Sequence, residues 1–113
     1  MNKIEAYIKP HKVSDITMAL QKLEGLPGVS VTDVRGFGRR AERDAPHPNS
    51  DDLMDFAPYV RMEIFCTDDT VEEIVSTIQK AAYTGVRGDG KIYVSPVKTA
   101  VRIGDSARGD EAV

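Results

Sequence analysis

Apolar and polar residues alternate with a period of two in several short stretches of the chain. Residues 3–9 place Ile4, Ala6 and Ile8 on one side and charged or aromatic residues on the other, which is the pattern of a half-buried strand. A similar alternation or a run of β-branched residues recurs further along the chain. The predicted strands span residues 3–9, 29–34, 60–66 and 91–97, with a short fifth strand at 100–103.

Two other stretches repeat their apolar residues at helical spacing. The first follows Pro10 and ends before Gly25, which is a typical stop signal. The second is predicted to begin with Asp69 as its N-cap and Glu72 at the third position of a capping box. The apolar stripes are Val13, Ile16, Leu20 and Leu23 in the first stretch, and Val71, Ile74, Val75, Ile78 and Ala82 in the second. Both stretches are therefore predicted to be amphipathic helices.

The predicted elements follow one another as two strand–helix–strand halves. Two such halves build a four-stranded antiparallel sheet with both helices on one face, which is the ferredoxin-like βαββαβ sandwich of the α+β class. This arrangement leaves the other face of the sheet bare, with Tyr7 and Phe65 among the residues on it. A bare face with aromatic residues predicts contact with another subunit.

A long segment without periodicity separates the two halves. Residues 39–58 contain three prolines, many charges and an Asn-Ser-Asp-Asp run. Structureless insertions longer than about 12 to 15 residues are uncommon in compact domains and are usually functional or disordered. The sequence therefore predicts one domain over residues 1–113, with a long loop at 37–57 between the second and third strands and a polar tail at 104–113.

The composition narrows the classes of protein. The formal net charge of -3 over 113 residues gives no electrostatic reason to expect nucleic acid as a partner. Cys66 is the only cysteine, so an internal disulfide framework is excluded and a cytoplasmic location is expected. No apolar run reaches the roughly 20 residues that cross a bilayer, and the first residues lack a signal-peptide core. Membrane insertion is therefore not expected.

Three stretches carry groups that suit an anionic ligand. Gly36-Phe37-Gly38 is followed by Arg39 and Arg40, so the backbone allows a close approach where two guanidinium groups stand. Residues 88–91, Gly-Asp-Gly-Lys, can turn successive amides toward a phosphate beside an ammonium group. Arg102 ends the last predicted strand. Each signal is weak alone, because a Gly-x-Gly is usually a turn, and neither the dinucleotide fingerprint nor the Walker A pattern is present.

Together, these stretches resemble the P-II nitrogen-regulatory signalling proteins. The resemblance rests on IEAYIKP at the start, VRGFGR at 34–39, DF at 55–56, TGVRGDGKIYVSPV at 84–97, VRI at 101–103 and RGDEAV at the end. It implies a homotrimer of ferredoxin-like subunits that binds adenine nucleotides (ATP, ADP or AMP) in the clefts between neighbours. It also implies that the long loop, called the T-loop in that family, docks on a protein partner such as a membrane transporter or an enzyme.

The resemblance assigns roles to particular residues of this chain. The motif at residues 36–39 matches the base of the T-loop beside the nucleotide, and residues 88–91 match the loop that wraps the phosphates. Arg102 matches an arginine that reaches the phosphates from the neighbouring subunit. The nucleotide-binding residues implied are Tyr7, Ser30, Gly36, Phe37, Gly38, Arg39, Glu63, Phe65, Gly88, Asp89, Gly90, Lys91 and Arg102. Of these, Tyr7, Ser30 and Phe65 differ from the residues usual in the family.

Three departures from the family pattern bear on the ligand. Arg40 replaces a glutamine that helps to hold magnesium and 2-oxoglutarate, and Tyr59 replaces a lysine that contacts that diacid. The permanent cation of Arg40 disfavours a magnesium ion at that position, so magnesium and 2-oxoglutarate are not expected as ligands. Gly104 stands where a second arginine contacts the phosphates, which favours ADP or AMP over ATP.

The predicted T-loop carries the partner-binding residues Arg40, His47, Ser50, Asp51 and Asp52. Asp52 occupies the place of the tyrosine that is uridylylated in enteric members, so that modification is not available. Ser50 lies near the serine that is phosphorylated in cyanobacterial members, but a polar loop residue is the favoured interpretation. A metal site formed by the histidine and the two aspartates is chemically sensible, although a solvated loop is favoured over it.

Three functions follow from these residues. The leading prediction is a non-catalytic signalling protein in which a nucleotide shifts the loop between conformations. One alternative is a small ferredoxin-like enzyme acting on phosphates. Its acylphosphatase chemistry would need an asparagine to position water. Apart from Asn2, the only asparagine is Asn49, which lies in the proline-flanked loop. The other alternative is a trimeric sensor of a metal ion or bicarbonate.

Overall fold

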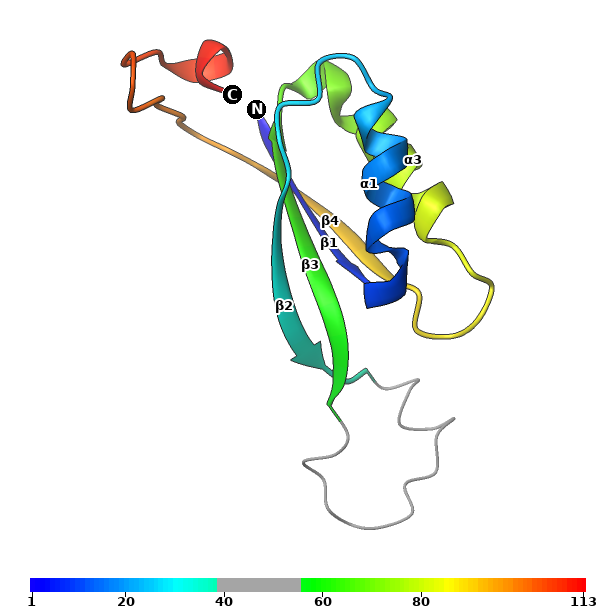
Figure 1. The fold of residues 1–113 in the computed structure, drawn as a ribbon. Helices are drawn as coiled ribbons and strands as arrows, with labels where there is room; N and C mark the ends of the chain where they lie inside the picture. Colours follow the sequence, from blue (N-terminus) through cyan, green and yellow to red (C-terminus); the bar gives the residue numbers. More distant parts are fainter. Residues whose placement is uncertain (39–55) are drawn as a thin grey trace.

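The computed structural model describes residues 1–38 and 56–113. The strands and helices follow one another in the predicted order (Figure 1). They are β1 (Asn2–Ile8), α1 (Val13–Gln21), β2 (Ser30–Gly36), β3 (Ala57–Cys66), α3 (Val71–Ala82) and β4 (Gly90–Pro96). Short 3₁₀ turns lie at Pro10–Lys12, Asp68–Thr70 and Gly109–Ala112. No helix in the described part of the chain is long and apolar enough to cross a membrane.

The four strands form one antiparallel sheet in the order β2-β3-β1-β4. In its register, Ile4 of β1 lies opposite Ile64 of β3 and Val94 of β4, so apolar positions of neighbouring strands fall on the same face. Both helices cover this face (Figure 1). The ferredoxin-like α+β fold predicted from the sequence is therefore confirmed.

The core lies between the sheet and the two helices. The side chains that alternate along β1 and β3 are buried, and each helix adds residues spaced one or two turns apart, because these spacings keep a side chain on one face. The buried residues of the described chain are Ile4, Ala6, Ile8, Ile16, Leu20, Val60, Met62, Ile64, Cys66, Ile74, Ile78 and Ala82. Cys66 is thus a core residue, and Leu23, which lies just beyond the end of α1, packs against the same cluster.

The opposite face of the sheet is uncovered in the single chain. Phe65 and Tyr93 lie on it and are 44% and 52% exposed, and Tyr7 contacts Tyr93 edge-on at 6.2 Å between ring centroids. A lysine–glutamate cluster lies on the same face, where Lys3 Nζ is 3.5 Å from Glu5 and 3.7 Å from Glu63. The bare face that the sequence predicted is present.

Two local predictions are wrong. Asp69 does not cap α3, because a 3₁₀ turn over Asp68–Thr70 precedes the helix and places Thr70 at the N-cap without a side-chain bond. The predicted fifth strand at 100–103 is absent, because only Val101 makes a bridge, to Arg108. After β4 the chain turns back on itself as a small hairpin that lies apart from the helices (Figure 1, orange to red).

Candidate functional site

The glycine loop, residues 84–90, connects the end of α3 to β4. Gly88 and Gly90 have φ angles of 86° and 109°, a region that residues with a side chain rarely adopt. At Gly90 a Cβ atom would lie 1.7 Å from the carbonyl oxygen of Tyr7, so β1 leaves no room for any side chain. These glycines are therefore required by the backbone and by the close approach of β1.

Asp89 holds the glycine loop together. Its carboxylate accepts hydrogen bonds from the Thr84 backbone N–H (2.9 Å), the Thr84 hydroxyl and the Gly85 N–H (3.2 Å). Lys9 Nζ lies 3.1 Å from the same carboxylate. The bonds from Thr84, together with those from Lys9 and Gly85, hold the pKa of Asp89 well below its usual range, because they stabilise the charged form. The loop thus has a fixed shape before any ligand arrives.

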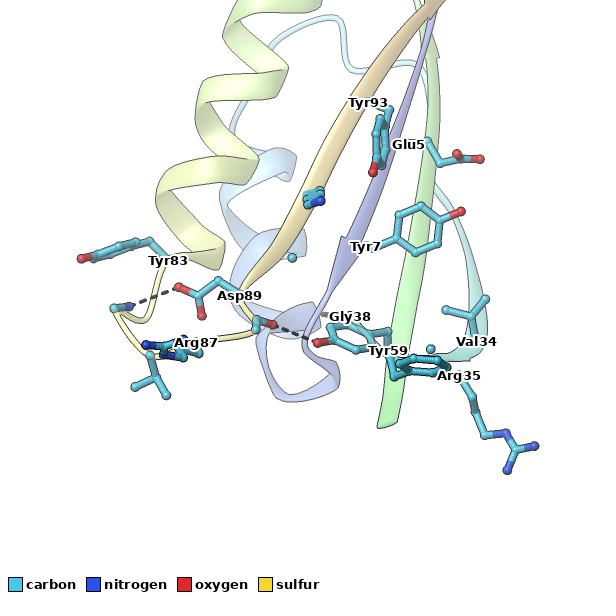
Figure 2. A pocket seen from close by; sticks show the side chains of 17 residues that line it. Glu5, Tyr7, Val34, Arg35, Gly38, Tyr59, Tyr83, Arg87, Asp89 and Tyr93 are labelled. Atoms are coloured by element: carbon cyan, nitrogen blue, oxygen red, sulfur yellow. Dashed lines mark hydrogen bonds between the residues drawn. The ribbon is translucent and has the colours of Figure 1, made fainter. Parts of the chain in front are cut away.

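A hollow of about 1010 Å³ lies between the glycine loop, the open face of the sheet and the end of β2. Figure 2 shows Tyr7 and Tyr93 on the sheet side of this hollow, and Asp89 and Arg87 on the loop side. Lys91, at the start of β4, also lines it. Within residues 1–38 and 56–113, Lys91 forms no ion pair, so its ammonium group is available to an anion.

The structure brings most of the predicted nucleotide-binding residues into this hollow. Those that line it are Tyr7, Gly36, Phe37, Gly38, Gly88, Asp89, Gly90 and Lys91. These residues come from β1, the end of β2, the glycine loop and the start of β4. The carboxylate of Asp89 is engaged by its own loop, so only the backbone of this residue is free to meet a ligand.

Three further predicted residues line a second hollow on the sheet. Ser30, Glu63 and Phe65 line a second hollow of about 570 Å³, together with residues 99–101 of the C-terminal segment, which we define as residues 97–113. The six residue steps from Ser30 to Gly36 along β2 span about 20 Å, but the two hollows adjoin in the middle of the sheet, where Glu5 of the first lies opposite Glu63 of the second. In one chain the two groups of predicted residues therefore line two separate, adjoining hollows.

Arg102 lies on the C-terminal segment and is held there. Its guanidinium is 2.8 Å from the Asp105 carboxylate and donates to the Glu111 carbonyl oxygen at 2.6 Å. A hydrogen bond from the Ala107 N–H and the contact with Arg102 lower the pKa of Asp105. In the single chain this arginine is paired within its own segment.

Sequence reasoning missed a contact made by Tyr59. It treated this residue as the loss of a cation, but the Tyr59 hydroxyl donates a hydrogen bond to the Gly88 carbonyl oxygen at 3.3 Å (Figure 2). It also missed Lys9, whose role depends on Asp89, a residue 80 positions away. No local pattern signals either contact, because both join segments that only the fold brings together.

Several predicted residues lie outside the described residues. They are Arg39, Arg40, His47, Ser50, Asp51 and Asp52. The metal alternative depends on three of them, so it is not addressed by the structure. In the described ranges, no group of three or more histidine, cysteine or acidic side chains is arranged to hold a metal ion.

Comparison with known proteins identifies the family. The family model described as Nitrogen regulatory protein P-II matches residues 1–107. Nitrogen regulatory proteins P-II from Azospirillum brasilense and Mesorhizobium japonicum are 41% and 43% identical over 113 residues, covering all of both chains. A crystal structure of Arabidopsis thaliana PII bound to citrate is similar with a TM-score of 0.80 and 37% identity, covering 99% of this chain and 91% of that one. This chain therefore belongs to the P-II family of nitrogen regulatory proteins.

Proposed function

We propose that this protein is a non-catalytic signalling protein that binds an adenine nucleotide, with the phosphates at the glycine loop and Lys91. One observation carries the proposal: Asp89 fixes the loop through Thr84, Gly85 and Lys9, while Lys91 in the same hollow is left unpaired within the described chain. A preorganised loop of backbone amides beside a cation is the usual way to hold phosphate groups.

The negative charge of Asp89 is compatible with a bound phosphate. Two backbone N–H groups, a hydroxyl and an ammonium group surround its carboxylate. This cation is Lys9, so the local charge of the aspartate is balanced without using Lys91. A phosphate at the loop then meets a net positive site rather than a bare carboxylate.

We infer that the complete site forms between subunits of a homotrimer. In the single chain, Ser30, Glu63 and Phe65 line a hollow that is separate from the one at the glycine loop, whereas the proposed nucleotide site needs residues of both groups. Subunits that pack through the open sheet face would bring the first hollow of one chain to the second hollow of the next. A cyclic arrangement of three copies makes three equal sites and closes on itself.

The nucleotide is proposed to be ADP or AMP as well as ATP, without magnesium and 2-oxoglutarate. Gly104 supplies no phosphate contact, and Tyr59 places a neutral hydroxyl, engaged with Gly88, where the resemblance implies a lysine. The related Arabidopsis protein was solved with citrate, a polycarboxylate. Citrate and 2-oxoglutarate are therefore included as competing ligands in the test below.

Signalling is proposed to pass from the nucleotide to a protein partner through residues 37–57. Gly36 and Phe37, at the end of β2, line the same hollow as the glycine loop. A ligand there contacts the base of this segment, so it can favour one conformation over another. The partner is proposed to be a membrane transporter or an enzyme in the cytoplasm. Nucleic acid is not proposed as a partner.

Isothermal titration calorimetry tests the proposal. ATP, ADP, AMP and cyclic AMP are titrated with and without magnesium, 2-oxoglutarate, citrate and bicarbonate. Lys91→Ala is expected to weaken nucleotide binding by about 10- to 150-fold, because a charge-assisted hydrogen bond contributes roughly 1.5 to 3 kcal/mol. Lys98→Ala, which removes an exposed lysine of the C-terminal segment, is the matched control and should bind as the wild type does.

Three results would contradict the proposal. Absence of heat with every adenine nucleotide would remove the nucleotide site. Rapid hydrolysis of ATP or an acyl phosphate, abolished by Lys91→Ala, would instead make the protein an enzyme. Sedimentation equilibrium measures the oligomeric state in the same buffer, and a stable monomer would remove the site between subunits.

A further inference from the structure

Tyr59 joins the start of β3 to the glycine loop. Its hydroxyl donates a hydrogen bond to the Gly88 carbonyl oxygen at 3.3 Å, across 29 residues of sequence. A Cβ atom at Gly88 would lie 3.2 Å from the same hydroxyl oxygen. The phenol therefore rests against the loop at the position where a glycine leaves space for it.

This bond orients the peptide unit between Gly88 and Asp89. In a trans peptide the C=O and the following N–H point in opposite directions, so holding the carbonyl oxygen of Gly88 also fixes the N–H of Asp89. Gly88 has a φ of 86° and little steric restriction on rotation. Tyr59 thus restrains a peptide unit whose rotation the glycine itself restricts little.

Tyr59 also belongs to the stem, which we define as residues 34–38 and 56–59. Within the stem, Tyr59 lies opposite Val34 and the last paired rung joins Gly36 to Ala57. Beyond that rung, Phe37 and Phe56 make an edge-on contact with ring centroids 5.0 Å apart. The ladder and this aromatic pair make the stem one unit, so a movement of Tyr59 is a movement of the stem.

We propose that Tyr59 is a positioning residue that links the glycine loop to the stem, so that a phosphate group bound at the loop changes the conformation of the stem. This inference rests on the proposed function, since the phosphate belongs to the adenine nucleotide. The link uses the carbonyl side of the Gly88–Asp89 peptide unit, and the phosphate uses the N–H side. A ligand that reorients this unit therefore strengthens or breaks the bond to Tyr59.

The first part of the test uses the ligand-free full chain. Tyr59→Phe removes only the hydroxyl, and amide hydrogen exchange is followed by NMR. Exchange in residues 84–90 is expected to become faster by about 2- to 12-fold, which is the effect of losing one neutral hydrogen bond. The control is Thr32→Val, which removes a hydroxyl from β2 outside the hollow and should leave exchange in the loop as it is in the wild type.

The second part adds ADP at saturating concentration. In the wild type, ADP is expected to change the exchange rates of the stem. In Tyr59→Phe, ADP still binds, but the change in the stem is expected to be at least about 2-fold smaller. Calorimetry on the same samples reports binding separately from the response of the stem.

The outcomes separate this inference from the proposed function. If ADP binds and the stem of Tyr59→Phe responds as fully as that of the wild type, the link is overturned and the nucleotide site stands. If exchange in residues 84–90 is the same in both ligand-free proteins, the hydroxyl does not hold the loop and the inference also fails. If the wild type binds no adenine nucleotide, the proposed function fails, and the role of Tyr59 in signalling is overturned with it.

Discussion

Two loops of this protein are each organised by one aspartate, and the two aspartates engage different kinds of cation. In the glycine loop, Asp89 pairs with Lys9 at 3.1 Å and leaves Lys91 for the ligand. In the C-terminal segment, Asp105 accepts the Ala107 N–H at 3.0 Å and pairs at 2.8 Å with Arg102 itself. The glycine loop therefore leaves Lys91 unpaired for an anion among the described residues. In the C-terminal segment the ion pair instead engages Arg102, the cation that the proposed site needs.

Exposure makes this difference larger. The side chains of Lys9 and Asp89 are 20% and 25% exposed, whereas those of Arg102 and Asp105 are 48% and 56% exposed. Exposed ion pairs contribute only about 0 to 1 kcal/mol, so Arg102 can exchange Asp105 for a phosphate at little cost. Fixed geometry in the glycine loop and an exchangeable arginine in the C-terminal segment are consistent with the proposed site between two subunits.

The largest expected effect is a loss of stability when a side chain at Gly90 prevents β1 from packing against the glycine loop. In Gly90→Ala the new Cβ would clash with the Tyr7 carbonyl at 1.7 Å and φ would be strained, so we expect a loss of more than about 3 kcal/mol of unfolding free energy. Gly104→Ala in the C-terminal segment meets no atom within 4 Å and should change it by less than about 0.5 kcal/mol. Urea denaturation at a fixed protein concentration measures both. Equal stability of the two variants would contradict the crowding at Gly90.

The organising carboxylate of the glycine loop should be the next most sensitive position. Asp89→Asn keeps the shape of the side chain but removes the charge that Thr84, Gly85 and Lys9 stabilise. We expect ADP binding to weaken by about 10-fold or more, because charge-assisted bonds are lost and the loop is no longer preorganised. Calorimetry measures the affinity. Unchanged binding would show that the loop does not need to be fixed in advance.

The matching change in the C-terminal segment should have the opposite sign. Asp105→Asn releases Arg102 from its ion pair, and ADP binding is expected to tighten by up to about 5-fold, because an exposed pair contributes no more than about 1 kcal/mol. Arg102→Gln is the control and should weaken binding. If Asp105→Asn also weakens binding, Asp105 positions the arginine for the nucleotide rather than competing for it.

The smallest expected effect is a dependence of stability on pH that arises from Asp89 in the glycine loop. An aspartate in the unfolded chain has a pKa of about 3.9, and the folded pKa of Asp89 lies well below this because of Thr84, Lys9 and Gly85. Its contribution to stability is therefore complete above about pH 4 and is lost as the pH falls toward the folded pKa. NMR titration of the Asp89 side-chain carbonyl measures this pKa. A midpoint near 4 would contradict the proposed bonding of the loop.

The helices and strands follow from local patterns, but their ends do not. The alternation of Ile4, Ala6 and Ile8 predicted β1 closely, because burial on one face of a strand requires this period. β3 begins at Ala57 rather than at residue 60, since its first residues are held by pairing with β2 and not by burial. The N-cap of α3 was misplaced at Asp69 because the 3₁₀ turn before the helix has no distinct sequence signal.

The candidate site was predictable in its parts and not in its arrangement. The glycines and Lys91 of the proposed phosphate-binding loop were recognisable in the sequence, since their pattern resembles that of the P-II family. The division of the predicted residues between two hollows was not, because distance along the sheet depends on strand register. The contact between Tyr59 and Gly88 was missed for the same reason.

The sequence by itself determined the ferredoxin-like fold, the P-II family and the chemistry available to a phosphate, because periodicity and motif are properties of neighbouring residues. Only the tertiary structure decided which charges remain available. It paired Lys9 with Asp89 and Arg102 with Asp105, and left Lys91 without an ion pair among the described residues. Electrostatic pairing depends on separations of a few ångströms between side chains, and such separations between distant parts of a chain exist only after it has folded.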